Sequence, residues 1–160
     1  MNEIKTWGEI VEIRRQFRLE KKKVVFTNGV FDILHSGHVD YLAKSRALGG
    51  VLIVGLNSDR SVKNIKGDKR PIINQDDRAI ILANLKPVDY VVLFDENTPA
   101  KLIDVIIPDV LVKGADWELD KIEGRETVIK NGGEVKNIEF VNEQSTSKII
   151  QKILDLYKDK

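Results

Sequence analysis

The stretch VVFTNGVFDILHSGH, residues 24–38, decides the fold that we expect for this chain. Residues 24–27 are a short β-rich run, and the apolar residues from 39 to 48 recur at helical spacing. Residues 28–38 therefore join the end of a strand to the start of a helix. In a sheet of parallel strands, such a junction lies at the edge where ligands bind.

The alternation of strands and helices continues along the chain. The sequence predicts further strands over residues 51–56, 88–94, 110–112 and 135–141, and helices over 4–19, 39–48, 76–84, 98–107, 126–131 and 145–157. This order predicts an α/β fold: a doubly wound, Rossmann-like parallel sheet of about five strands with helices on both faces. We expect a single domain over residues 1–160, in which 1–22 form an N-terminal helix and connection and 23–160 form the core.

The composition excludes several classes of function. The 26 Lys and Arg residues nearly balance the 25 Asp and Glu residues, so the sequence predicts neither a nucleic-acid partner nor a membrane partner. The chain has no cysteine, which excludes disulfides, thiolate zinc sites and a cysteine nucleophile. Neither a signal peptide nor an apolar run of about 20 residues is visible, so we expect a cytoplasmic protein.

Two histidines carry the first chemical signal. His35 and His38 stand three residues apart, and Gly37 between them leaves room for a phosphate near the backbone. Free N–H groups at a helix start attract anions, and imidazoles can donate hydrogen bonds to phosphoryl oxygens. Metal binding by the pair would need carboxylate ligands from elsewhere, and we predict no metal-ligating residues. A purely structural role for the histidines is the remaining alternative.

A polar segment, residues 59–75, follows the second predicted strand. It contains Gly67, Pro71 and several lysines and arginines, which is typical of a functional loop over the strand ends. The sequences of a P-loop and of a dinucleotide-binding loop are both absent, so phosphate binding here would need other groups.

Residues 27–38 resemble the signature of the nucleotidyltransferase superfamily that carries an H-x-G-H motif. Residues 54–59, 66–71, 77–78, 95–99, 108–117 and 145–150 are similar to the heptose 1-phosphate adenylyltransferase family. The resemblance implies transfer of AMP from ATP to D-glycero-β-D-manno-heptose 1-phosphate, which gives ADP-heptose and pyrophosphate. It implies Mg²⁺ as the cofactor and a product used for lipopolysaccharide or other surface glycans.

The resemblance also implies the partners of this chain. They are the small molecules ATP and a sugar 1-phosphate, a homodimer partner, and a separate sugar kinase in the same pathway. Positions 30, 115, 117 and 147 depart from the family pattern, with Val, Ala, Trp and Ser at these positions. Of these, Ala115 and Trp117 bear on the identity of the acceptor sugar.

The expected site residues fall into two groups. The catalytic candidates are His35, His38 and Lys66. The residues expected to bind ATP or the acceptor are Thr27, Asn28, Gly29, Phe31, His35, His38, Asn57, Asp59, Arg78, Lys113, Gly114, Ser145, Thr146 and Ser147. Lys66 and Arg78 are expected to clamp phosphates, although both could be ordinary surface residues. Asp59 could instead cap a helix, 113–114 could be a turn, and a serine of 145–147 could be a helix cap.

Two other functions remain open from the sequence. One is a cytidylyltransferase that acts on glycerol 3-phosphate or another small alcohol phosphate. The other is a nucleotide-sensing or scaffolding module that binds without turnover. For the main interpretation, we expect ATP at the strand–helix junction of His35 and His38, with its base near residues 113–117 and 145–147.

Overall fold

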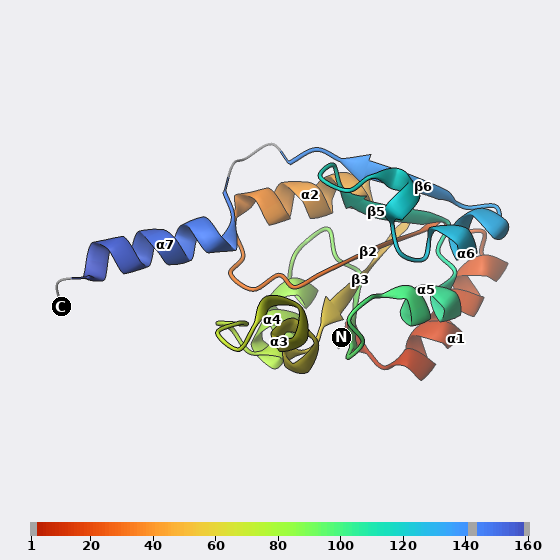
Figure 1. Ribbon diagram of the computed structural model, residues 1–160. Coiled ribbons are helices and arrows are strands. Elements are labelled where there is room, and N and C mark those ends of the chain that lie inside the picture. Colours follow the sequence, from red (N-terminus) through yellow and green to blue (C-terminus); the bar gives the residue numbers. More distant parts are fainter. Residues whose placement is uncertain (1–2, 141–143, 159–160) are drawn as a thin grey trace.

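The structure is a computed structural model that describes residues 3–140 and 144–158. It contains one parallel sheet of six strands in the order β1-β4-β3-β2-β5-β6 (Figure 1). The strands are β1 (Ile4–Lys5), β2 (Val24–Gly29), β3 (Val51–Asn57), β4 (Tyr90–Phe94), β5 (Val110–Gly114) and β6 (Glu134–Ile138). The helices are α1 (Trp7–Leu19), α2 (Ser36–Arg46), α3 (Asp59–Lys66), α4 (Gln75–Ala83), α5 (Ala100–Ile106), α6 (Arg125–Lys130) and α7 (Thr146–Tyr157), with a short 3₁₀ turn at Leu119–Lys121.

Helices cover both faces of the sheet, and each face has its own apolar core. One core packs α1, α5 and α6 against the sheet, and the other packs α2 and α4 against it. Successive residues of β3 alternate between the two cores: Val51 and Ile53 belong to the first, and Leu52 and Val54 to the second. The predicted α/β, doubly wound fold class is confirmed.

The start of the chain differs from the prediction. Residues 4–5 form the edge strand β1, which pairs with Val91 and Val92 of β4, so the sheet has six strands instead of about five. Thr6 then caps α1 in a capping box with Glu9. The Trp7 indole N–H donates a 2.9 Å hydrogen bond to the Leu93 carbonyl oxygen of β4. A strand of two residues is too short to show a periodicity. The predicted helix over 4–19 therefore included the residues of β1.

The polar segment 59–75 begins with a helix and not with a loop. The Ser58 hydroxyl caps α3 by accepting a hydrogen bond from the Ser61 N–H, and Val62 is buried beneath the helix. Lys66 is the last residue of α3, and residues 67–74 are the actual loop. α4 is capped by Asn74 and begins at Gln75, one residue before the predicted start.

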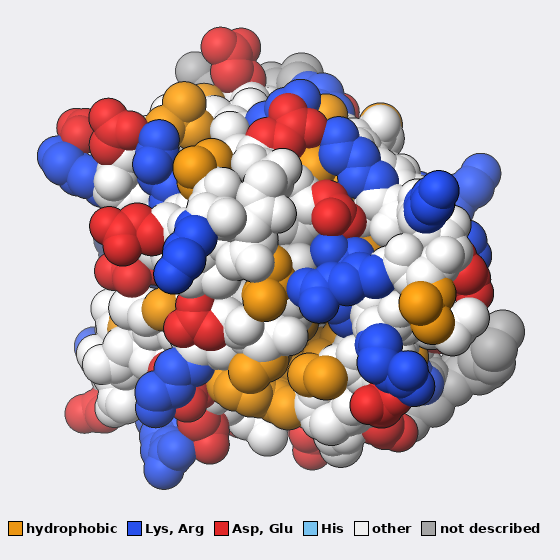
Figure 2. Space-filling model, turned by 90° about the vertical axis from the view of Figure 1, so that its right-hand side faces the viewer, with side chains coloured by type: hydrophobic (Ala, Val, Ile, Leu, Met, Phe, Trp, Pro, Cys, Tyr) orange, Lys and Arg blue, Asp and Glu red, His pale blue; other side chains and the backbone are white. Residues whose placement is uncertain are grey.

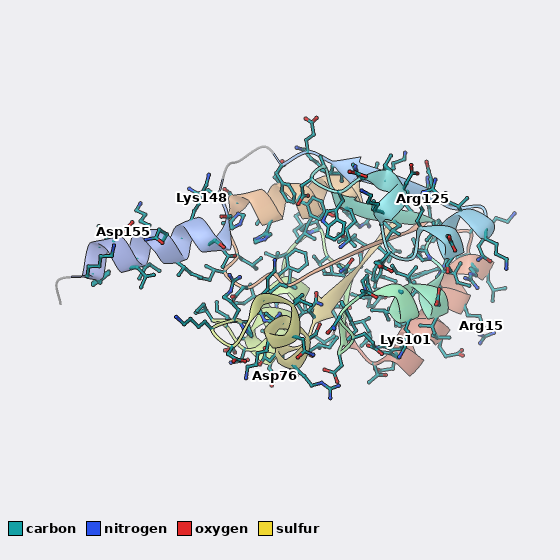
Figure 3. The ribbon with its side chains drawn as sticks, viewed as in Figure 1. Arg15, Asp76, Lys101, Arg125, Lys148 and Asp155 are labelled. Carbon is teal, nitrogen blue, oxygen red and sulfur yellow. The ribbon has the colours of Figure 1, made fainter. Side chains whose placement is uncertain are left out.

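The last predicted elements lie at the limit of the described residues. β6 ends at Ile138, and position 141 of the predicted strand lies outside the described residues. α7 is capped by Ser145 and projects away from the rest of the domain (Figure 1). Lys148 and Asp155 on α7 lie outside the body that carries Arg15 and Arg125 (Figure 3).

The molecular surface mixes charges of both signs. Figure 2 shows Lys and Arg side chains interspersed with Asp and Glu on the face at the right of Figure 1. Within residues 3–140 and 144–158, no helix has the length and apolar character needed to cross a membrane.

Candidate functional site

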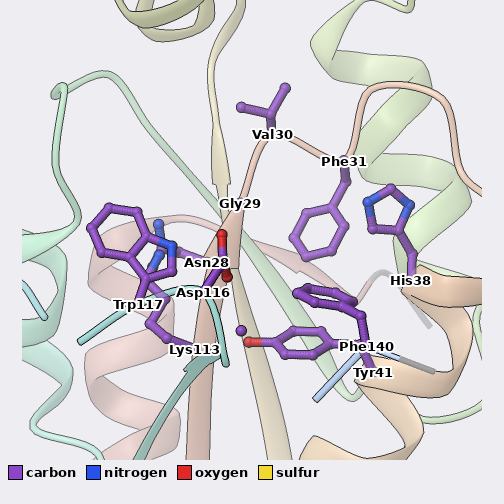
Figure 4. A pocket seen from close by; sticks show the side chains of 11 residues that line it. Asn28, Gly29, Val30, Phe31, His38, Tyr41, Lys113, Asp116, Trp117 and Phe140 are labelled. Atoms are coloured by element: carbon purple, nitrogen blue, oxygen red, sulfur yellow. The ribbon is translucent and has the colours of Figure 1, made fainter. Parts of the chain in front are cut away.

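Two adjoining cavities lie at the carboxyl edge of the sheet, where β2 and β5 run side by side and the chain leaves them in opposite directions. The first cavity measures about 160 Å³, and its lining includes His38, Tyr41, Asp116 and Phe140 (Figure 4). The second cavity measures about 400 Å³ and extends over the ends of β3 and β4. Both cavities share five lining residues: Asn28, Gly29, Val30, Lys113 and Trp117.

His35 and His38 form the most unusual contact of the site. Their rings stack with centroids 3.9 Å apart, and the Nδ1 atom of each ring is buried without a hydrogen-bond partner among the described residues. Burial lowers the pKa of His35, and burial together with the His35 ring lowers the pKa of His38 to about 4. Near pH 7 both rings are therefore neutral hydrogen-bonding groups, and a bound anion would favour their protonated forms.

The start of α2 adds a second attraction for anions. His35 occupies the N-cap position of α2 and makes no capping hydrogen bond with its side chain, and no acidic residue stands in the first turn. The positive end of the helix dipole is therefore not neutralised by its own residues. Phe31, in a left-handed conformation with φ 47°, packs edge-on against the His38 ring and directs the chain into this turn.

Aromatic rings face one another across the first cavity. Trp117 stands on one side, and Phe31, Tyr41 and Phe140 stand on the other (Figure 4). The Phe140 ring stacks on Tyr41 with centroids 5.1 Å apart and remains about half exposed. The Tyr41 hydroxyl bonds the Thr27 hydroxyl, which donates to the Val112 carbonyl oxygen. Thr27 thus supports the cavity through Tyr41 and does not line it.

Lys113 stands between the two cavities. Its ammonium lies 5.1 Å from the centroid of the Trp117 ring, as in a cation–π contact. Burial lowers the pKa of Lys113 to about 8, so the side chain is still mostly charged near pH 7. Gly114 follows at the end of β5, where a Cβ atom would lie 2.3 Å from the Phe140 ring. Both residues stand at the end of β5 and line the first cavity, and their contact with a ligand stays a prediction.

Asp32 ties the polar loop to the histidine segment. Its buried carboxylate accepts hydrogen bonds from the N–H groups of Ile72 and Ile73 and from the Arg70 guanidinium at 2.5 Å. Burial alone would raise the pKa of Asp32, but these donors together lower it. The carboxylate therefore holds the loop after α3 against the segment that leads to His35 while it remains ionised.

Arg78 does not occupy the position of a phosphate clamp. The residue is only 1% exposed, and its guanidinium donates to the carbonyl oxygens of Ile73, Val30 and Asn57 and to the Asp59 carboxylate. The expectation of direct phosphate contact is therefore corrected: Arg78 joins the segments that surround the site. From the sequence, Arg78 could also be an ordinary residue of a helix surface. Its burial could not be read there, because the carbonyl groups that surround it come from distant segments.

The remaining predicted residues at the ends of β3 and α3 lie around the second cavity. Asn57 lines it and donates from its amide to the Ser61 hydroxyl. Asp59 is the first residue of α3, whose cap is Ser58, and it pairs with Arg78. Asp59 lines neither cavity. Lys66 is exposed and lines the second cavity.

The serine and threonine segment at the start of α7 lies apart from both cavities. The Ser145 hydroxyl caps the helix by accepting a hydrogen bond from the Lys148 N–H, and Ser147 is exposed. The Thr146 hydroxyl donates to the Ile33 carbonyl oxygen at 3.2 Å, which brings this segment beside the turn that leads to His35. Of the two segments expected near a base, Lys113, Gly114, Asp116 and Trp117 line the first cavity, whereas residues 145–147 line neither cavity. The position of the base stays a prediction.

Metal ligands are not gathered at the site. Within the part of the chain that the structure describes, no group of three or more His, Cys, Asp or Glu residues could hold a metal ion. The described residues thus do not fit a cation cage made by the protein.

Comparison with known proteins assigns the family. The family model described as cytidylyltransferase-like matches residues 26–152. The chain belongs to the cytidylyltransferase-like family. This membership makes it a nucleotidyltransferase domain. Residues 26–152 include every residue that lines either cavity.

Individual relatives agree with this assignment. The domain is 58% identical over 136 residues to a bifunctional protein HldE of Citrifermentans bemidjiense, covering 85% of this chain and 28% of the relative. It is 54% identical over 158 residues to the bifunctional protein HldE of Campylobacter concisus, covering 99% of this chain and 32% of the relative. The chain thus spans about a third of the length of these relatives.

A solved structure of a lipopolysaccharide core biosynthesis protein from Thermoplasma volcanium is also similar to this cytidylyltransferase-like domain. The TM-score is 0.62 at 32% sequence identity, and the match covers 77% of this chain and 99% of that chain.

Sequence reasoning missed several residues that line the cavities. They are Val30 in both cavities, Tyr41, Asp116 and Phe140 in the first cavity, and Ile65, Asn97, Thr98, Pro99 and Glu123 in the second. Residues 95–99 and 116 lay within blocks that resembled the family, which was a usable signal. Phe140 was expected within the strand 135–141 but follows the end of β6, and Glu123 lies in an irregular segment. No local pattern indicated a role at the site for either residue.

Proposed function

We propose that this domain transfers AMP from ATP to D-glycero-β-D-manno-heptose 1-phosphate, with ADP-heptose and pyrophosphate as the products. The observation that carries the proposal is the position of His38, which lines the first cavity at the uncapped start of α2. The high identity to the bifunctional HldE proteins supports the choice of reaction.

The reaction needs no nucleophilic side chain. An oxygen of the acceptor phosphate attacks the α-phosphorus of ATP and forms a new P–O bond, while the bond to the β-phosphate breaks and pyrophosphate leaves with the electron pair. The protein must hold two anions together and stabilise the negative charge that develops. His35, His38, Lys113 and the N–H groups at the start of α2 supply hydrogen bonds and positive charge for this purpose.

Mg²⁺ belongs to the proposal as part of the nucleotide substrate. Because the described residues provide no cage of ligands, we expect the phosphates of ATP and water to hold the ion. Its role when bound is to neutralise phosphate charge, and the residues described here keep their roles around it.

The proposal extends to the setting of the reaction. It places the domain in the cytoplasm, where ATP is available, and requires a sugar kinase reaction that supplies the anomeric phosphate. It also includes a homodimer, for which α7 offers exposed Ile153, Leu154 and Leu156. The mass of the protein in solution tests this last point.

A matrix of nucleotides and acceptors tests the reaction. ATP and CTP are each offered with the heptose 1-phosphate, other sugar 1-phosphates and glycerol 3-phosphate, and pyrophosphate release is measured. We expect release with ATP and the heptose 1-phosphate. Preference for CTP and glycerol 3-phosphate would favour the cytidylyltransferase alternative, and binding of nucleotide without release in any combination would favour a sensing module.

A further inference from the structure

The second cavity supports an inference that rests on the proposed function. We propose that this cavity binds the sugar of the acceptor, and that the Glu123 carboxylate selects the acceptor by accepting hydrogen bonds from its hydroxyl groups. The ligand class is a polyhydroxylated sugar phosphate.

The position of the cavity is the first argument. It shares the wall formed by Asn28, Lys113 and Trp117 with the first cavity, so two ligands that fill both would meet at this wall. Its volume of about 400 Å³ lies in the range of small-molecule sites. Since His38 lines only the first cavity, the triphosphate belongs there and the second cavity is left for the acceptor.

The lining chemistry suits a sugar. The Trp117 indole is 45% exposed and offers an apolar ring face to the C–H groups of a sugar. Asn97 and Thr98 provide an amide and a hydroxyl, which can donate to or accept from sugar hydroxyls. Lys66 and Lys113 provide positive charge for a phosphate.

Glu123 is held at the cavity by its two neighbours. Ile122 is 3% exposed and belongs to the core under α5 and α6. Gly124 has φ 81°, and a Cβ atom there would lie 2.5 Å from the Ile103 side chain. The backbone on both sides is therefore fixed, and the exposed Glu123 side chain lines the cavity without a hydrogen bond or ion pair to any other described residue.

Charge sets the orientation of the acceptor. A carboxylate repels a phosphate and accepts hydrogen bonds from hydroxyls, whereas lysines attract the phosphate. Lys113 lines both cavities, but Glu123 lines only the second. The acceptor therefore lies with its phosphate toward Lys113 and the nucleotide, and with its hydroxyl-bearing end toward Glu123. This orientation presents the attacking oxygen to the α-phosphorus.

Glu123→Gln tests the assignment because it removes the charge and keeps the shape. We expect the KM for the heptose 1-phosphate to rise by about tenfold to a hundredfold, as for loss of charge-assisted hydrogen bonds. The KM for ATP stays within about twofold, since Glu123 does not line the first cavity. Glu126→Gln is the matched control, because Glu126 is exposed in the same segment but lines neither of these cavities.

Calorimetric titration of the acceptor into wild type and Glu123→Gln separates the two proposals. An unchanged acceptor KM and affinity in the variant, or an equal rise in the KM for ATP, overturns the role of Glu123 while the proposed transfer reaction stands. Absence of pyrophosphate release by the wild type overturns the transfer reaction. Weaker acceptor binding by the variant in titration would then still support the cavity assignment.

Discussion

The imidazole rings of His35 and His38 stack with their centroids 3.9 Å apart and their planes 29° from parallel. Two rings so close cannot both become cationic without repulsion, and burial opposes the charge of each. The pair is therefore neutral near pH 7, and its two buried Nδ1 atoms have no hydrogen-bond partner among the described residues.

The lowered pKa of His38 predicts a pH-dependent stability. In the unfolded chain the imidazole titrates near its ordinary value of about 6.5, and in the folded protein at about 4. Between these values the unfolded state binds more protons, so the free energy of unfolding falls as the pH drops through this window. Urea unfolding of wild type and His38→Asn, at about pH 7 and about pH 5, should show a smaller drop in the variant. An equal drop in both proteins would contradict the lowered pKa.

The His38 side chain should act mainly on the transition state. Loss of a hydrogen bond to a developing oxyanion costs about 10²–10³ in turnover, so His38→Ala should lower kcat by this factor. ATP affinity should remain within about tenfold, because the contact strengthens only as charge develops. Kinetics, ATP titration and thermal unfolding of the variant decide this. A structural histidine would instead lower the melting temperature and leave kcat of the folded protein near normal.

Two lysines of α3 provide a matched pair of variants. Lys66 lines the second cavity, whereas Lys63, one turn earlier, lines neither cavity. Lys66→Ala should lower kcat/KM by about tenfold to a hundredfold, the effect of losing a charge-assisted contact to phosphate, and Lys63→Ala by less than about twofold. Steady-state assays with the acceptor as the varied substrate measure this. Equally small effects would make Lys66 an ordinary solvated lysine.

Arg78 should contribute to stability rather than to phosphate binding. Arg78→Met leaves the carbonyl oxygens of Val30, Asn57 and Ile73 and the Asp59 carboxylate without their buried donor. Breaking a fully buried pair costs about 3–5 kcal/mol, and we expect about 2–4 kcal/mol here because Asp59 is a third exposed.

Arg60→Ala is the control for Arg78. Arg60 forms an exposed ion pair with Asp95, and its loss should cost less than about 1 kcal/mol in the same denaturant titration. If Arg78→Met kept normal stability and lost ATP affinity, Arg78 would be a phosphate clamp after all.

Much of the fold followed from local patterns in the sequence. β3 was readable because residues 51–56 are buried on both faces of the sheet and contain no polar side chain. β1 was not readable, since only its pairing with β4 defines it. α3 was not predicted, because most of its side chains are polar and exposed. The cap Ser58 and the buried Val62 were the signals in the sequence that indicated a helix.

The candidate site was predictable where it lies next to a strand end. Asn28 and Lys113 lie near the carboxyl ends of β2 and β5, and His38 lies in the first turn of α2, so the topology brings them together. The environment of Arg78 could not be predicted, because its partners come from three separate segments. Phe140 and Glu123 were missed for the same reason: their positions depend on packing against Tyr41 and on the buried neighbour Ile122.

The short strand β1 and the Trp7 indole also cover the edge of the sheet at β4. β4 would otherwise present a row of unpaired N–H and C=O groups to a strand of another molecule, and such an edge is a template for aggregation. Pairing with Ile4 and Lys5, followed by the indole hydrogen bond to the Leu93 carbonyl oxygen, occupies this edge. Because β1 is only two residues long, it offers almost no new edge of its own for strand pairing with another molecule.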